Sequence, residues 1–266
     1  MKASPNRPRA EARIALLHPL QFPVDGAGHL ALAPLTGASE AAAEGDAWAL
    51  LAALAQEGPD RAGPSALGRL SRGDGDRALA ALHGHLYGPR IVADARCSHC
   101  DGQFELRFAL PDLVAGRWPD GSATGTPPAV TVAGARLRLP VCADRATDPA
   151  SLLAALVLEG ALPPLAQAEA ALEAADPALE LDLAGDCPGC GTHQAVPFSM
   201  AGFLGAALQR DHAFLLREVH LIARAYGWAL DEILSLTRSA RQGFVRLILA
   251  DLGAVQASGP LRRAMG

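Results

Sequence analysis

Apolar and charged residues alternate in several short stretches in the middle of the chain. In FELRF (104–108), every second residue is apolar, which is the period of a strand with one buried face. The same alternation in ARLRLPV (135–141) and LELDLAGD (179–186) predicts two more strands. The segments IVADAR (91–96) and HQAVPF (193–198) are expected to complete two β-hairpins with their neighbours.

The first part of the chain mixes strand and helix patterns. ARIALL (12–17) and GHLALAPL (28–35) predict two short strands with a turn between them. Apolar residues at helical spacing then predict one helix over 39–56, with Ser39 as its N-cap. A further helix is expected over 74–87, where two aspartates near the N-terminus favour the helix dipole.

Helical spacing dominates the chain after Met200. In DHAFLLREVHLIARAYGW (211–228), the apolar residues fall on one helix face. Gly227 is expected to end this helix in the left-handed conformation, and Thr237 to cap the last helix. The residues of that last helix expected to point inward are Phe244, Leu247 and Ile248.

These patterns together predict an α+β fold, with two β-hairpins flanked by helices and an all-helical C-terminal region. Two helices, at 149–158 and 165–174, are expected to form a helical insertion between the hairpins. We expect three regions: N-terminal strands and helices over 1–90, an α+β body over 91–200, and helices over 201–266.

Composition and charge narrow the class of protein. Half of the residues are hydrophobic and 19% are charged, as in a globular protein rather than a disordered one. The net charge of -5 offers no global attraction to nucleic acid or to an anionic membrane. No apolar stretch has the length of a membrane span, and the first residues lack the pattern of a signal peptide. We expect a protein of the bacterial cytoplasm.

The chain carries the same cysteine hook twice. Cys97 and Cys100 frame one C-x-x-C, and Cys187 and Cys190 frame the other. A shift of 90 residues superposes the two hooks, and each is followed by a phenylalanine eleven residues after its first cysteine. Each hook lies between two predicted strands, so each resembles a zinc knuckle on a β-hairpin. Four thiolates would complete one structural Zn²⁺ site, shared about a pseudo-two-fold axis, with no open position for catalysis.

Other interpretations of the cysteines are weaker. A redox C-x-x-C usually begins a helix, whereas these precede strands, and two local disulfides would need an oxidising compartment. His99 and His193 lie beside the hooks and are expected to be solvated neighbours, although either could replace a thiol as ligand. The fifth cysteine, Cys142, is expected to be a small buried apolar residue.

We find no catalytic motif and expect no enzyme. The chain has no phosphate-binding glycine loop, no nucleophile elbow and no H-E-x-x-H zinc motif. A rival interpretation is a zinc-stabilised helix-turn-helix regulator that binds DNA. In that case Arg238, Arg241 and Arg246 in the closely spaced last helices would contact phosphates. The acidic net charge and the apolar character of the last helix argue against it.

Several segments, in the same order along the chain, resemble segments of the T4-type phage baseplate hub assembly family. Related proteins occur in phage-like contractile injection systems. The resemblance spans roughly residues 70–250. It is carried by GDRALAALHGHLYGPRIVADARCSHCDGQFELRF, an alternating strand with LRLP, LELDLAGDCPGCGTHQAVPF, and FLLREVHLIARAYGWALDEILSLTRSARQGFVRLI. The segment with REVHLIARAYGW is the most specific part, and the N-terminal 60 residues match only loosely.

The resemblance implies a non-enzymatic assembly factor or minor component of the baseplate hub in a contractile tail. Its implied partners are hub, spike or other tail proteins, and the chain could be incorporated into the particle. The four hook cysteines fall on the metal hooks of the family, and the Arg217-to-Trp228 segment falls on a recurrent C-terminal docking element. The residues expected to bind a partner are Arg217, His220, Arg224 and Trp228.

Overall fold

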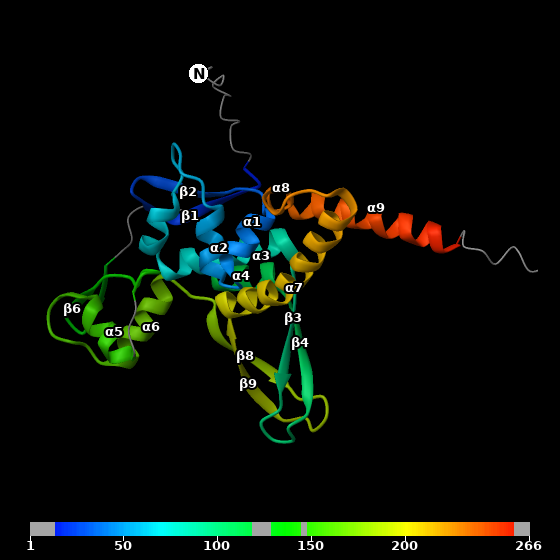
Figure 1. Cartoon of the computed structure of the whole chain (residues 1–266). Coiled ribbons are helices and arrows are strands. Elements are labelled where there is room, and N and C mark those ends of the chain that lie inside the picture. The colour runs from blue at the N-terminus through cyan, green and yellow to red at the C-terminus, as the bar shows by residue number, and fades with distance from the viewer. Residues whose placement is uncertain (1–13, 119–128, 145–147, 258–266) are drawn as a thin grey trace, which may run out of the picture.

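A computed structural model of the chain describes residues 14–118, 129–144 and 148–257. It is a mixed helical and β structure, in which the described strands form four small antiparallel sheets. In Figure 1, a helical body carries two long β-hairpins that project from it side by side, and a small separate module lies at one flank. The last helix extends away from the body on the opposite flank.

The strands pair mainly with their neighbours in sequence. β1 pairs with β2, β3 with β4, and β8 with β9, whereas β6 lies between β5 and β7. The strands are β1 (Leu16–Val24), β2 (Ala27–Leu32), β3 (Arg90–Arg96), β4 (Gln103–Ala109), β5 (Val130–Val132), β6 (Ala135–Leu137), β7 (Val157–Glu159), β8 (Glu180–Asp186) and β9 (His193–Ser199).

Helices precede, separate and follow the hairpins. They are α1 (Gly37–Ala43), α2 (Ala47–Leu54), the 3₁₀ helix η1 (Pro64–Arg69), α3 (Arg72–Tyr87), α4 (Leu110–Arg117), α5 (Pro149–Leu156), α6 (Leu165–Ala175), α7 (Met200–Tyr226), α8 (Leu230–Ser235) and α9 (Arg238–Ala257). The predicted α+β character is therefore correct, as is the succession of helices after Met200.

The helix predicted over 39–56 is wrong in one respect, because it is two helices. Glu44 adopts a left-handed conformation with φ of 48°, and Gly45 follows with φ of 84°. These two residues end α1, and Asp46 then caps α2. The N-cap of α1 is Thr36 rather than Ser39, since Ser39 is the third residue of the helix and completes a capping box with Thr36.

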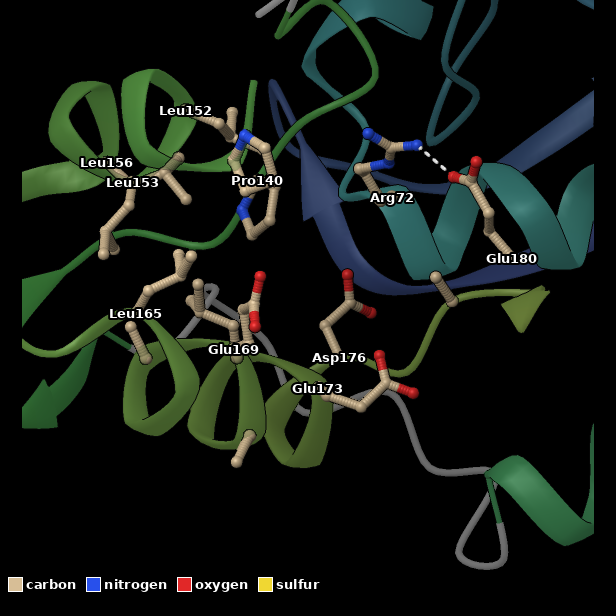
Figure 2. A pocket seen from close by; sticks show the side chains of 15 residues that line it. Arg72, Pro140, Leu152, Leu153, Leu156, Leu165, Glu169, Glu173, Asp176 and Glu180 are labelled. Carbon is tan, nitrogen blue, oxygen red and sulfur yellow. Dashed lines mark hydrogen bonds and ion pairs between the residues drawn. The ribbon is translucent and has the colours of Figure 1, made fainter. Parts of the chain in front are cut away.

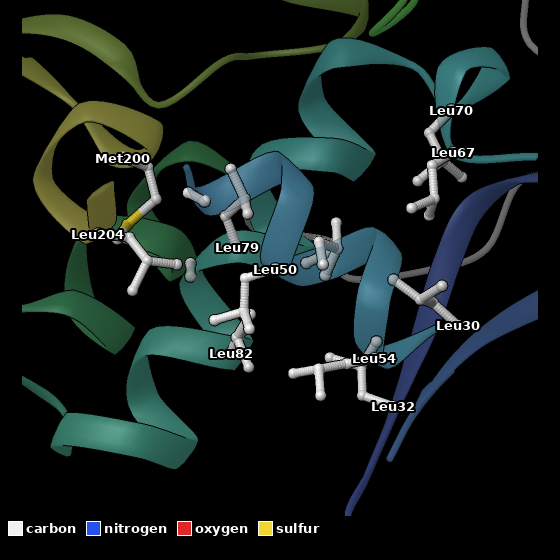
Figure 3. Packing of buried hydrophobic residues seen from close by; sticks show 14 of the residues in the cluster. Leu30, Leu32, Leu50, Leu54, Leu67, Leu70, Leu79, Leu82, Met200 and Leu204 are labelled. Carbon is white, nitrogen blue, oxygen red and sulfur yellow. The ribbon is translucent and has the colours of Figure 1, made fainter. Parts of the chain in front are cut away.

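The main hydrophobic core lies between the β1–β2 hairpin and the helices α2, α3 and α7 (Figure 3). Leucines of α2 and α3 meet the start of α7 there. Residues of all three predicted regions, 1–90, 91–200 and 201–266, contribute to this one cluster. The division into regions stays a prediction, and its first and last residues, 1–13 and 258–266, lie outside the described chain.

The first turn of α3 joins β1 to the body through a fully buried carboxylate. The backbone amides of Gln21 and Phe22 donate hydrogen bonds of 2.8 and 2.9 Å to Asp74, which is 0% exposed. Arg77, one helical turn later, forms an ion pair with the same carboxylate. Because Ser71 caps the helix, Asp74 lies at its positively polarised N-terminus. The charge of Asp74 is therefore compensated on several sides.

The flanking module contains β5, β6, β7, α5 and α6 and has a small core of its own. The strand predicted over 135–141 is shorter than expected, because β6 ends at Leu137 and Pro140 has no amide hydrogen for a sheet. Beyond it, the amide of Cys142 donates to the carbonyl of Leu70, so the chain there runs along the body. The predicted helices of this module are both present.

The C-terminal helices form a second, smaller core around Ile222, Ile233 and Ile248. Gly227 ends α7 with φ of 71°, and the Thr237 hydroxyl lies 3.3 Å from the amide of Ala240, so both predicted helix ends are confirmed. One expectation for α9 was wrong: Leu247 is 59% exposed instead of buried. No helix in the described ranges is long and apolar enough to span a lipid bilayer.

Replacing Asp74 with alanine should destabilise the protein strongly. The change leaves two strand amides and the Arg77 guanidinium without their shared acceptor. Breaking a buried pair of this kind costs about 3–5 kcal/mol, which denaturant unfolding would measure. In the control variant Glu105→Ala, which loses the exposed pair with Arg107, the loss should be below about 1 kcal/mol. Equal losses for the two variants would contradict this role of Asp74.

Candidate metal centre

The two hooks lie at the tips of two hairpins with the same dimensions. β3 and β4 pair from Arg90 opposite Ala109 to Arg96 opposite Gln103. β8 and β9 pair over the same number of residues, and every residue of this register is shifted by 90. In both hairpins the first cysteine follows directly on the last residue of the first strand. The sequence therefore places each hook where the ladder ends.

The backbone of the two turns is also the same. The amide of Cys97 donates to the carbonyl of Gly102, and the amide of Cys187 donates to that of Thr192. The residue after each second cysteine is left-handed, with φ of 60° at Asp101 and 73° at Gly191. Aspartate and glycine are among the residues that adopt this conformation most easily. The local sequence thus suits one tight turn in both places.

The structure brings all four predicted ligands together. The ligand atoms of Cys97, Cys100, Cys187 and Cys190 lie within 4.8 Å of one another. Two short contacts join the hairpins: Cys97 Sγ lies 3.6 Å from Cys190 Sγ, and Cys100 Sγ lies 3.7 Å from Cys187 Sγ. The first cysteine of each hook is buried and the second is exposed. These distances are much longer than a disulfide bond of about 2.05 Å.

The arrangement of the thiols fits one metal ion. The Thr192 hydroxyl and amide lower the pKa of Cys190 to about 6. At Cys100 the amide of Gly102 lowers the pKa, but the three neighbouring thiols outweigh it and raise the pKa to about 12. Four thiols this close cannot all lose their protons unless a cation balances the charge. Four sulfur donors at this separation are compatible with a single Zn²⁺ ion.

The two histidines beside the hooks lie outside the cluster of ligand atoms, which contains cysteines only. His193 is exposed, and its Nδ1 lies 2.7 Å from a carboxylate oxygen of Asp186. His99 is exposed as well, while its backbone amide donates to Cys97 Sγ over 3.4 Å. The expectation that both side chains are solvated neighbours agrees with this geometry.

Residues other than the cysteines also connect the two hairpins. The amide and hydroxyl of Ser98 donate to Gln194 Oε1 over 2.9 and 3.0 Å, and Gln194 Nε2 donates to the carbonyl of Arg96. At the base of the hairpins, the rings of Phe108 and Phe198 meet edge to face with centroids 5.5 Å apart. The sequence pattern identified both phenylalanines but missed Gln194, since no local signal marks a contact between the hairpins.

A groove of about 550 Å³ lies between the flanking module and the body (Figure 2). Leucines of α5 and α6 line one side, and the other side carries the ion pair of Arg72 with Glu180. Asp176 lies at this polar end and accepts a 2.9 Å hydrogen bond from the amide of Gly73. The Arg72–Glu180 ion pair and the hydrogen bond to Asp176 connect the start of α3 to β8 and to the end of α6.

Two carboxyl groups at this junction are buried enough to titrate abnormally. Burial raises the pKa of Asp76 to about 6, although the amide of Leu179 donates to this group. Burial likewise raises the pKa of Asp176 to about 6. From sequence, Asp76 is only a favourable charge near a helix N-terminus, because its burial depends on contact with the distant Leu179, just before β8. Nearby, Cys142 is half-buried, and burial raises the pKa of its thiol to about 12.

The residues expected to bind a partner lie in two different environments. Arg217, His220 and Arg224 are exposed on α7. Trp228 is half-buried and belongs to an aromatic cluster, in which its ring stacks on Tyr226 and meets Phe244 edge to face. The arginines expected to contact phosphates in the DNA-binding alternative also differ in exposure. Arg241 is 1% exposed and forms ion pairs with Glu40 and Glu218.

Comparison of the chain with protein-family models, curated proteins and solved structures finds no match in any of the three.

Replacing Asp76 with asparagine should change how stability depends on pH. The folded-state pKa near 6 lies above the unfolded value of 3.8, so wild-type stability falls as pH rises from about 4 to 6. The variant keeps an acceptor for Leu179 but lacks this titration. Its free energy of unfolding, relative to wild type, should therefore rise between pH 4 and 7 by up to about 3 kcal/mol.

Asp60→Asn should show the opposite trend in the same measurement. The amide of Gly28 and the side chain of His29 hold the pKa of Asp60 below its usual value. The wild-type protein therefore gains stability from this group as pH rises. The free energy of unfolding of the variant, relative to wild type, should fall over the same range. Parallel pH profiles for the two variants would contradict the burial of Asp76.

Proposed function

We propose that this chain is a non-enzymatic assembly factor or minor structural component of the baseplate hub in a phage-like contractile tail. The observation that carries the proposal is the closed four-cysteine cluster that joins two hairpins of equal register. Such a cluster positions two projecting elements rigidly without offering a reactive centre. The ordered series of motifs that resembles the baseplate hub assembly family supplies the biological setting.

In this proposal Cys97, Cys100, Cys187 and Cys190 hold one structural Zn²⁺. The two hairpins act as zinc knuckles repeated about an approximate two-fold axis. The metal would supply the positive charge that four neighbouring thiolates require and would connect strands far apart in the chain. Ser98 and Gln194 would support the site by fixing the first turn relative to the second hairpin.

The protein would act through contacts with hub, spike or other tail proteins. Arg217, His220 and Arg224 present a solvent-exposed face of α7 to such a partner. Trp228 would contribute indirectly, because its ring packs against Phe244 and thereby fixes α9 next to the end of α7. No contact with a membrane is part of the proposal.

The alternative of a helix-turn-helix regulator has less support. Arg238 pairs with Glu40 and Asp211, and Arg241 pairs with Glu40 and Glu218. Two of the three arginines named for phosphate contacts are thus already neutralised inside the protein. Arg246 alone remains exposed on that helix, and one cation gives little of the electrostatic attraction on which DNA binding depends.

Elemental analysis of the purified protein should find about one zinc ion per chain. Cys187→Ser should abolish this binding, since the closed site loses one of its four thiolates and the ligand atoms of His99 and His193 lie outside the cluster. Hydrogen exchange of the β3, β4, β8 and β9 amides should then speed up at least about 100-fold, while α7 stays protected. Cys142→Ser is the matched control and should keep the zinc. A zinc content that is unaffected by Cys187→Ser would overturn the metal assignment.

A tagged chain, expressed together with its neighbouring genes, should co-purify tail proteins in near-stoichiometric amounts, as identified by mass spectrometry. An assembly factor of this kind forms a stable complex with its partners through an exposed surface, so the partners should stay bound during purification. Recovery of DNA fragments in place of tail proteins would favour the regulator. Recovery of the chain alone, with its zinc, would leave a metal-stabilised protein without the proposed role.

A further inference from the structure

The charges of α7 are sorted between its two faces. Its two carboxylates both point toward neighbouring helices: Asp211 pairs with Arg238 over 2.8 Å, and Glu218 pairs with Arg241 over 2.9 Å. Asp211 also accepts a 2.7 Å hydrogen bond from the hydroxyl of Tyr87. These interactions attach α7 to the start of α9. They leave no carboxylate of α7 on its outward face.

The outward face carries arginines at a regular interval. Arg210, Arg217 and Arg224 are exposed, and no ion pair joins them to a carboxylate within the described chain. They are seven residues apart, so their Cα atoms follow one another at about 10.5 Å along one side of the helix. Phe214 and Leu221 fall between them at the same interval. We call these five residues the arginine stripe.

The apolar members of the stripe are unusual for a purely solvated face. Phe214 is 62% exposed, which is the highest exposure recorded among the large hydrophobic residues of the described chain. Leu221 is half-buried beside the C-terminal core. Spacings of four and three residues in turn, from Arg210 to Arg224, form the seam by which one helix packs along another. The buried face of α7 already packs on the body, so this seam is a second one.

The stripe also differs from the rest of the surface. Most arginines of the described chain have a carboxylate partner, as Arg69, Arg96 and Arg136 do even where they are exposed. The protein as a whole has a net charge of -5. A row of cations without carboxylate partners, on a protein that is acidic overall, favours an acidic partner surface and disfavours a basic one. The apolar residues between the cations add a contact that a free anion would not use.

We propose that the arginine stripe binds an amphipathic α-helix of the partner protein, with carboxylates at seven-residue intervals and apolar residues between them. This inference rests on the proposed function, since it specifies the element of the tail protein that the chain recognises. Each arginine would meet a carboxylate of the partner helix, and Phe214 would pack between them. The partner helix would lie along the stripe on α7, and at the Arg210 end it would border the groove that α7 forms with β3 and β9.

The observations favour a helix over a nucleic acid. A nucleic-acid surface needs several cations that follow the phosphates, usually on a basic protein. Here three arginines lie in a straight row, and the protein is acidic overall. A repeat of seven residues matches the repeat of a second helix directly.

The probe is a fluorescent peptide of about 21 residues, long enough for a marginal helix, with glutamates every seventh residue and leucines between them. Its binding to the full chain is measured by anisotropy. Arg217→Glu together with Arg224→Glu should weaken binding at least about tenfold. The matched control is Arg69→Glu with Arg136→Glu, which makes the same change in net charge at exposed positions of η1 and β6 and should alter binding less than about twofold.

A charge exchange completes the test and guards against misfolding. A peptide with lysine in place of each glutamate should bind the Arg217→Glu, Arg224→Glu variant better than the wild-type chain. Failure of the first peptide to bind, or equal losses in the two double variants, would overturn the inference. Binding of a labelled DNA duplex without binding of the peptide would overturn it in favour of nucleic acid.

The same variants distinguish this inference from the proposed function. If tail proteins co-purify equally with wild type and with Arg217→Glu, Arg224→Glu, the stripe is not the docking surface, and the proposed function stands. If the peptide binds through the stripe but no tail protein co-purifies, the recognition of an acidic helix stands and the proposed function fails.

Discussion

The contact of four thiols between two hairpin tips is the constraint on which the middle of the structure depends. A two-stranded hairpin is only marginally stable in water, and the small cluster around Cys97, Cys187 and Phe104 buries few other side chains. The hairpins meet at the four thiols, at the hydrogen bonds of Ser98 with Gln194, and at the base, where Phe108 packs against Phe198. Because the hooks are distant in sequence, the metal ion proposed for them would also close a long loop of the chain.

The sequence predicted those parts of the centre that depend on local pattern. The C-x-x-C spacing, the flanking alternation and the shift of 90 residues identified all four cysteines and both hairpins, because turn geometry and strand period are properties of short segments. The end of α7 and the start of α9 were predictable for the same reason, because Gly227 and Thr237 have conformational or capping preferences of their own.

The parts that could not be predicted depend on contacts between distant segments. From sequence, Arg241 is expected to be a surface cation, yet it is buried and pairs with Glu40 and Glu218 of two other helices. From sequence, Asp74 is expected only to favour the start of a helix, yet its carboxylate also accepts hydrogen bonds from two backbone amides of β1. Leu247 fits an apolar stripe on α9, but the neighbouring helices cover Ile248 and part of Phe244 and leave Leu247 exposed. In each case the deciding partner is absent from the local window.

The ion pairs that close the C-terminal helices also determine what the surface offers. Arg238 and Arg241 form ion pairs with the carboxylates on the inner side of α7, and these pairs neutralise the charges of the two arginines. Since the outer side of α7 has arginines but no remaining carboxylate, folding itself separates the two signs of charge. Moving Asp211 or Glu218 outward would both loosen α9 and neutralise the outer arginines. The stability of the helices and the charge of their exposed face are therefore set by the same few residues, which ties this surface to the fold that carries it.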